Sequence, residues 1–210
     1  MPSAADARTA DSPPSNVSTA RLATTADVST AVVKPASRAD FIVVAQPGPQ
    51  DNDATRQAFR SALRDTERPV LMVPKDWSVV SFGQRIAIAW HDDIWTTQAM
   101  ISALPLFAGA AEVHLLAGVR PEAPNPLHPD RFGNCEASVK VHILNLDYVP
   151  FGGLLLSRAQ ELKADLLIMA SYVHSPFSHS VLAGATRYVI THAALPVLMR
   201  TSYMLSAPSH

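Results

Sequence analysis

The sequence has little of three things that mark particular protein classes: cysteine, clustered basic residues and apolar runs long enough to cross a membrane without interruption. Cys135 is the only cysteine, so no internal disulfide can form, which fits a reducing compartment. Lysine and arginine number 17 against 18 acidic residues and form no block, which argues against a nucleic-acid or anionic-lipid partner. The most apolar stretch, residues 100–119, contains Pro105, Glu112 and His114. These residues favour a helix followed by a strand over a membrane span.

The first 38 residues are poor in large apolar side chains. Alanine, serine, threonine, aspartate and proline dominate them, so we predict a mostly disordered, low-complexity segment. Residues 18–33 have the pattern of a weak helix, which Pro35 is expected to stop. The first residues carry Asp6 and Asp11 and have no apolar core of a signal peptide, so we expect a cytoplasmic protein.

Apolar runs alternate with amphipathic segments along the rest of the chain. Continuous apolar runs such as residues 39–45 are typical of parallel strands that are covered on both faces. The order of strands and helices predicts a parallel sheet with right-handed crossovers. Strands are expected over residues 39–45, 69–74, 85–90, 112–119, 138–144, 165–170 and 196–200, and helices over residues 54–64, 94–108, 153–163 and 183–192. Asp51, Asn52 or Asp53 is expected to cap the first helix, Asp92 or Asp93 caps the second, and residues 120–137, rich in proline, form a loop.

An internal repeat organises these elements. Residues 39–45 match residues 164–170, and residues 69–72 match residues 196–199, at offsets of 125 and 127 residues. We therefore predict a complete domain that follows a fragment of a second copy. The expected divisions are a disordered segment over 1–38, the C-terminal fragment of a first domain over 39–76, a linker over 77–84, a complete domain over 85–201 and a tail over 202–210.

Several segments of the second copy are similar to a known family. They are residues 86–90, 103–107, 159–169, 174–175, 184–189 and 196–199. These segments resemble the universal stress protein family, and the repeat resembles its tandem type, with only residues 40–74 recognisable in the first copy. The resemblance implies a doubly wound α/β fold of the adenine-nucleotide-alpha-hydrolase-like kind. Its expected form is a five-stranded parallel sheet with helices on both faces, plus a β-α-β fragment of the other copy.

The resemblance also implies a nucleotide site, because many family members bind ATP at the carboxyl ends of the strands. Their phosphate motif has three glycines, whose positions fall here on Ala170, Val173 and Ala183. Glycine lets backbone N–H groups approach phosphates, and β-branched Val173 is the least suitable replacement, so we predict a degenerate site. The turn after the first strand is His91-Asp92-Asp93, whose carboxylates repel a triphosphate unless a metal intervenes. Any retained adenylate is expected to contact Trp90, His91, Asp92, Val119, Ala170, Val173, His174, Ser175, Ala183, Gly184, Ala185 and Thr186.

Other chemistry finds no support in the sequence. The spacing of His174, His179 and His192 matches no closed zinc pattern. Ser175 and Asp165 form no catalytic set with His174, because adjacent side chains diverge and no nucleophile elbow is present. Gly152-Gly153 lacks the lysine of a P-loop and is interpreted as a hinge where a helix begins. We expect no catalytic residue, no metal and no cofactor, and therefore no enzyme.

The leading hypothesis is a non-catalytic, universal-stress-like stress-response protein that acts through association with itself or a partner. In the resembling family the last strand commonly pairs antiparallel with the last strand of another domain. We therefore expect Val70 to Val73 beside Val197 to Met199, within the chain as a pseudo-dimer or between chains as a homodimer. Two alternatives stay open: a regulator that binds ATP or another adenylate, and a decayed gene product.

Overall fold

The computed structural model describes residues 28–78, 82–91, 93–119, 138–146, 150–171 and 181–201. The first part of the chain forms α1 (Val28–Ala36), β1 (Ile42–Ala45), α2 (Asp53–Asp65) and β2 (Val70–Val73). The second part forms β3 (Arg85–Trp90), α3 (Ile94–Phe107), β4 (Glu112–Val119), β5 (Ser138–Asn145), α4 (Phe151–Glu161), β6 (Leu166–Ser171), α5 (Val181–His192) and β7 (Val197–Thr201). Among these described helices, none combines the length and apolar character that crossing a membrane requires. The predicted loop over 120–137 and tail over 202–210 lie outside the described residues.

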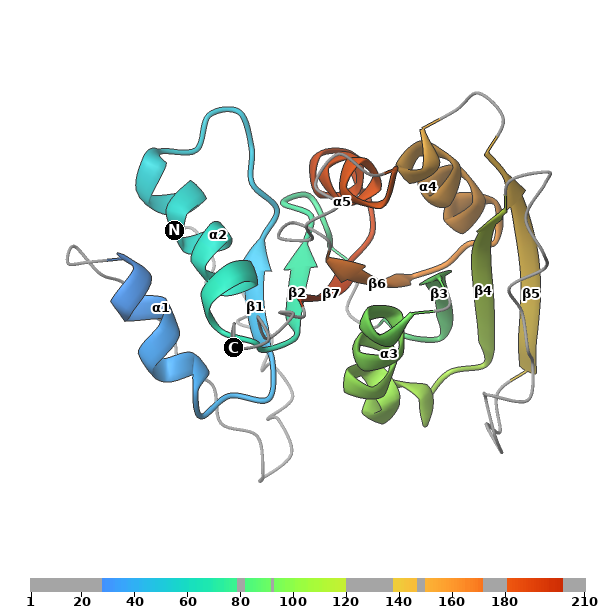
Figure 1. Ribbon diagram of the computed structural model, residues 1–210, viewed down its shortest axis with the longest axis horizontal. Coiled ribbons are helices and arrows are strands. Elements are labelled where there is room, and N and C mark those ends of the chain that lie inside the picture. The colour runs from blue at the N-terminus through green and yellow to red at the C-terminus, as the bar shows by residue number, and fades with distance from the viewer. Residues whose placement is uncertain are drawn as a thin grey trace, which may run out of the picture.

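All strands join one seven-stranded sheet in the order β1-β2-β7-β6-β3-β4-β5 (Figure 1). The five strands of the second part are mutually parallel, so the predicted five-stranded parallel sheet is confirmed. Strands β1 and β2 are parallel to each other, as expected for a β-α-β fragment. The fragment lengthens the sheet instead of forming a separate body, because β2 pairs antiparallel with β7.

Helices cover both faces of this sheet, which makes the fold doubly wound. On one face α2, α4 and α5 bury a cluster that includes Phe59, Leu155 and Val189. On the other face α3 buries a second cluster, with Ala99 and Ala103 against β3 and β6. The strands between the two layers are apolar on both faces, which is why they read as continuous apolar runs in the sequence.

The joint between the two copies pairs Val70 with Met199, Leu71 with Leu198 and Met72 with Val197. This is the antiparallel pairing within the chain that the family resemblance implies. Strand β2 has β1 on its other side, and β7 has β6. Neither strand keeps a free edge, so the same two segments cannot also join two chains in a homodimer without first separating.

Helix α1 differs from the sequence-based expectation. It runs over Val28–Ala36, in a segment expected to be mostly disordered, and it contains Pro35, which was expected to stop the weaker helix over 18–33. Proline here lies in the last turn, where its missing N–H removes a single hydrogen bond. Packing supplies the stability that the β-branched sequence lacks: Ser29 Oγ lies 2.7 Å from Ser61 Oγ of α2, and Val32 packs against the main core.

This helix extends the repeat beyond what the sequence comparison finds. The series α1-β1-α2-β2 has the same order and strand pairing as α4-β6-α5-β7. Ser29, Val32 and Ala36 of α1 share the spacing of Gly152, Leu155 and Ala159 on the inner side of α4. The first copy is therefore represented by four consecutive elements instead of the three that the sequence indicates.

The interpretation of Gly152-Gly153 as a hinge is wrong. Both glycines lie inside α4, whose first residue is Phe151. A Cβ on Gly152 would lie 2.7 Å from the Cβ of Tyr188 and 2.9 Å from the carbonyl oxygen of Ala185, both in α5. Gly152 is therefore the point where two helices approach each other closely, a use of glycine that depends on its missing side chain.

Candidate functional site

The carboxyl end of the sheet between β3 and β6 is the place where this fold would hold a ligand. From β3 the chain proceeds to β4 and β5 on one side and then crosses to β6 and β7 on the other. Such a reversal of strand order is a topological switch point, and ligands of open α/β sheets bind in the crevice outside it. The predicted residues Trp90, His91 and Ala170 lie here, at the ends of these two strands.

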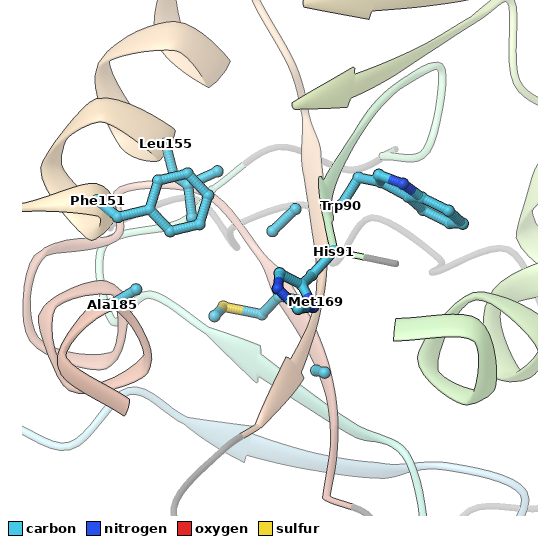
Figure 2. A pocket seen from close by; sticks show the side chains of 8 residues that line it. Trp90, His91, Phe151, Leu155, Met169 and Ala185 are labelled. Atoms are coloured by element: carbon cyan, nitrogen blue, oxygen red, sulfur yellow. The ribbon is translucent and has the colours of Figure 1, made fainter. Parts of the chain in front are cut away.

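Here the described residues leave a small cavity of about 10 Å³, which is room for about one water molecule. Figure 2 shows Phe151 and Leu155 reaching toward it from α4, with His91 and Met169 on the same side of the strands and Trp90 on the opposite side. The residues that line the cavity are Ala89, Trp90, His91, Phe151, Leu155, Met169, Ala170 and Ala185.

The aromatic ring of Phe151 packs against the end of β4. Its ring lies directly on the backbone of Gly118, where an added Cβ would be 2.7 Å from Cε2 of the ring. The side chain is 5% exposed and belongs to the main core cluster. Gly118 thus makes room for an aromatic ring, and glycine within a strand commonly marks such a close approach.

In the turn after β3, the carboxylate of Asp93 contacts residues that are close to it in sequence. Asp93 caps α3 by accepting a hydrogen bond of 2.7 Å from the backbone N–H of Thr96. Of the two predicted caps, Asp93 is therefore confirmed, and Asp92 lies outside the described residues. The same carboxylate lies 3.1 Å from Nδ1 of the His91 imidazole. A carboxylate at a helix N-terminus is stabilised by the helix dipole, which makes Asp93 a structural residue.

The remaining predicted contacts are spread over α5 and over residues outside the described ones. Ala183, Gly184, Ala185 and Thr186 lie in the first turns of α5, where Ala185 reaches the cavity and Thr186 is fully buried. The structure therefore brings together Trp90, His91, Ala170 and Ala185 of the predicted set. Val119 ends β4, and Asp92, Val173, His174 and Ser175 lie outside the described residues.

Four lining residues were missed by the sequence reasoning: Ala89, Phe151, Leu155 and Met169. Leu155 and Met169 read as ordinary core positions of a helix and a strand, and nothing in their spacing sets them apart. A signal did exist for Phe151, because a bulky aromatic residue directly precedes the close-packed Gly152, and Gly118 interrupts an otherwise apolar strand.

Asp165 precedes β6, at the amino end of the sheet, and His174 and Ser175 lie outside the described residues. The Asp165 carboxylate accepts backbone hydrogen bonds from Gly83, Gln84 and Arg85 at 2.9, 3.0 and 3.0 Å. Its role is to hold the start of β3 against the start of β6.

A polar cluster lies at the opposite end of the sheet from the crevice, between β4, β5 and α4. Arg158 donates to Nδ1 of His142 at 3.1 Å, and the other ring nitrogen of His142 lies 3.1 Å from Nδ1 of His114. Because arginine has only donors, His142 must accept at Nδ1 and donate from Nε2. His114 therefore carries its proton on Nε2, 3.2 Å from Glu112 Oε2 but without the alignment of a good hydrogen bond.

Burial lowers the pKa of both histidines below the ordinary value. For His114 the carboxylate of Glu112 opposes this effect, and for His142 the guanidinium of Arg158 adds to it. The hydrogen bond from Lys140 lowers the pKa of Glu112. A lowered pKa favours the neutral imidazole, which suits a structural hydrogen-bond chain. Among the residues that the structure describes, no group of three or more histidine, cysteine, aspartate or glutamate side chains is arranged to hold a metal ion.

Comparison with known proteins shows which known fold this chain has. No protein-family model matches the sequence, and no curated protein matches it. A universal stress protein from Archaeoglobus fulgidus matches in structure with a TM-score of 0.63 and 19% identity, over 82% of this chain and 64% of that one. A functionally unknown protein from Pseudomonas aeruginosa matches with a TM-score of 0.59 and 15% identity, over 85% of this chain and 69% of that one. The chain, which spans 64% of the length of the Archaeoglobus protein, has the universal stress protein fold.

Proposed function

We propose that this chain is a non-catalytic stress-response protein of the universal stress type, with a degenerate nucleotide site. It acts in the cytoplasm through association with itself or with another protein. The observation that carries the proposal is the small size of the cavity that the described residues leave at the switch point. Phe151, Leu155 and Met169 leave about 10 Å³ where the fold would seat a nucleotide. An adenylate would have to displace core side chains, and burying those side chains contributes to folding.

The turn after β3 supports the same conclusion. The Asp93 carboxylate is fixed at the start of α3, close to the crevice, by its hydrogen bond to the backbone N–H of Thr96. A triphosphate placed there would meet this negative charge. Helix α5 begins at Val181 and still offers a helix N-terminus, but two of the predicted glycine positions carry Ala170 and Ala183.

Titration of the full chain with ATP and magnesium, followed by isothermal calorimetry, tests the proposal. We expect no saturable heat at micromolar nucleotide. ADP and AMP serve as further ligands, because they remove charge while keeping the adenine. Saturable binding of any of them at micromolar concentration would instead establish the adenylate-binding regulator. The same titration is repeated with a Phe151→Ala variant. If the Phe151 ring blocks the site, this variant should bind nucleotide more tightly than the parent chain.

A further inference from the structure

Helix α4 contacts two strands with one face. Phe151, Leu155 and Arg158 follow one another at spacings of four and three residues, which places them on the same side of the helix. At the amino end of α4, Phe151 packs on Gly118 of β4. Nearer its carboxyl end, Arg158 Nη2 donates to Nδ1 of His142 in β5 at 3.1 Å. The contact between Arg158 and His142 therefore helps to hold the carboxyl end of α4 on the sheet.

The two hydrogen bonds that link Arg158, His142 and His114 run in one direction. Arginine can only donate, so Nδ1 of His142 must be the nitrogen without a proton, and Nε2 carries the proton. That Nε2–H donates to Nδ1 of His114 at 3.1 Å. Each of these ring nitrogens is already used as a donor or an acceptor. Neither histidine can therefore take up a further proton at this contact without the loss of one of the two hydrogen bonds.

The surrounding charges decide which histidine holds a further proton. His114 is favoured, because Oε2 of Glu112 lies 3.2 Å from its Nε2. A protonated His114 donates from Nδ1, so His142 must then accept at Nε2 and carry its own proton on Nδ1. That proton faces the guanidinium of Arg158, which loses its acceptor. Among the described residues, the charged groups that face the pair from β3, β4, β5 and α4 are Arg85, Glu112, Lys140, Arg158 and, through Arg158, Glu161.

We propose that the contact between Arg158 and His142 is acid-sensitive, and that uptake of a proton by the histidine pair releases the carboxyl end of α4 from β5. Once released, Arg158 turns to solvent and keeps its ion pair with Glu161. The amino end of α4 stays in place, because Gly152 packs closely against Ala185 of α5. The inference goes beyond the proposed function, since neither Arg158 nor His142 lines the cavity at the switch point.

The electrostatics of the pair give the same direction. Burial lowers the pKa of both histidines when α4 is docked, and the guanidinium of Arg158 lowers that of His142 further. Release of α4 separates His142 from this guanidinium and admits water, so its pKa returns toward the ordinary value of 6.5. The released form then binds protons more readily, and acid favours it. Between about pH 7.5 and about pH 5.5 the opening equilibrium can rise by up to about tenfold for each histidine.

Hydrogen exchange of the full-length chain, followed by mass spectrometry at about pH 7.5 and about pH 5.5, tests the proposal. Protection factors correct each rate for the pH dependence of exchange in an unfolded chain. We expect the protection of residues 155–162 to fall by up to about tenfold on acidification, if one histidine takes up the proton. At the lower pH this exchange should not respond to low urea concentrations, because opening one helix end exposes little surface. Exchange in β6 should accelerate with urea.

His142→Asn removes the titrating group and keeps the contact. The side-chain oxygen of asparagine can accept from Arg158 in place of Nδ1, and an amide takes up no proton in this pH range. We expect the variant to lose most of the acid response of residues 155–162. His192→Asn, at the exposed end of α5, is the matched control and should respond as the parent does.

A second variant, His142→Lys, places a permanent positive charge beside Arg158. It should show at about pH 7.5 the low protection that the parent reaches only in acid. The proposal is overturned if residues 155–162 of the parent keep their protection at the lower pH, or if their exchange there accelerates with urea as that of β6 does. It is also overturned if His142→Asn responds to acid like the parent, or if His142→Lys is as protected as the parent at neutral pH. The nucleotide titration has no bearing on these results.

Discussion

At the scale of single residues, Gly152 is a position where an added methyl group would clash with both side-chain and backbone atoms. Its missing side chain lets α4 touch α5 at Tyr188 and Ala185. We expect Gly152→Ala to lower the free energy of unfolding by about 1–3 kcal/mol, because overpacking forces the two helices apart. Urea denaturation followed by circular dichroism measures the change.

The neighbouring glycine provides the control. A Cβ on Gly153 would lie 3.6 Å from the ring of Tyr188, an ordinary contact. Gly153→Ala should therefore be neutral or should stabilise the helix by up to about 1 kcal/mol, since alanine is the better helix former. Equal effects of the two substitutions would show that the close approach of α4 and α5 contributes little to stability.

The histidine pair predicts a dependence of stability on pH. Both His114 and His142 have a pKa lowered below 6.5 in the folded state, chiefly by burial. The unfolded chain then binds protons more readily, so their contribution is complete above about pH 6.5 and is lost as the pH falls from there toward the folded pKa. The charged groups around them are Arg85, Glu112, Lys140, Arg158 and Glu161.

His114→Gln tests this dependence, because glutamine keeps hydrogen-bonding groups but does not titrate. We expect the wild-type chain to lose stability between about pH 7.5 and about pH 5.5, by at most about 1.4 kcal/mol per pH unit for each histidine. The variant should lose less over the same interval in urea denaturation. His192→Gln is the control, since that histidine lies at the exposed end of α5. If the free energy of unfolding of His114→Gln depends on pH as it does in the wild-type chain, His114 is not a source of the pH dependence.

The roles of some residues could be predicted from their neighbours in sequence, and the roles of others could not. Asn52 and Asp93 were both among the expected caps, because a cap depends on a few neighbours in sequence. The contact of Phe151 with Gly118 depends on how α4 crosses β4, which no local pattern encodes. The predicted degeneracy at Val173 stays a prediction, since that residue lies outside the described part of the chain.

At the scale of elements, the stability of α1 depends more on its contacts with α2 and the main core than on the helix propensity of its own sequence. Val32 is its contact with the main core, beside the Ser29 to Ser61 contact with α2. We expect Val32→Asp to detach α1, because a buried carboxylate without a partner is costly. Hydrogen exchange of residues 28–36 should rise strongly while exchange in β6 stays slow. Lys34→Asp, on the exposed side of the same helix, should leave exchange in α1 largely unchanged.

The strands and α1 show why elements differ in predictability. Strands β3 and β4 have the predicted bounds, because their apolar runs end at polar or turn residues on both sides. Helix α1 has four β-branched residues in its nine and an internal proline, so propensity argued against it. A contact with residue 61, which is far along the sequence, decides its stability.

At the scale of the whole molecule, the two copies share one hydrophobic core. The cluster beneath α2, α4 and α5 contains Leu63 and Met72 from the first copy together with Val197 and Met199 from the second. The antiparallel joint between β2 and β7 runs through its middle. The fragment is therefore expected to unfold together with the complete domain.

Met72→Ala tests this expectation at the joint. Met72 is 0% exposed and lies opposite Val197, so removing its side chain leaves a cavity between the copies. We expect a loss of about 2–5 kcal/mol and a single unfolding transition in which calorimetric and van't Hoff enthalpies agree. Leu71→Ala, on the less buried face of the same strand, should cost less. Two separate transitions, or loss of slow exchange in β1 and β2 alone, would contradict this expectation. The fragment would then unfold independently of the complete domain, although the two share one sheet, because the complete domain would be stable without it.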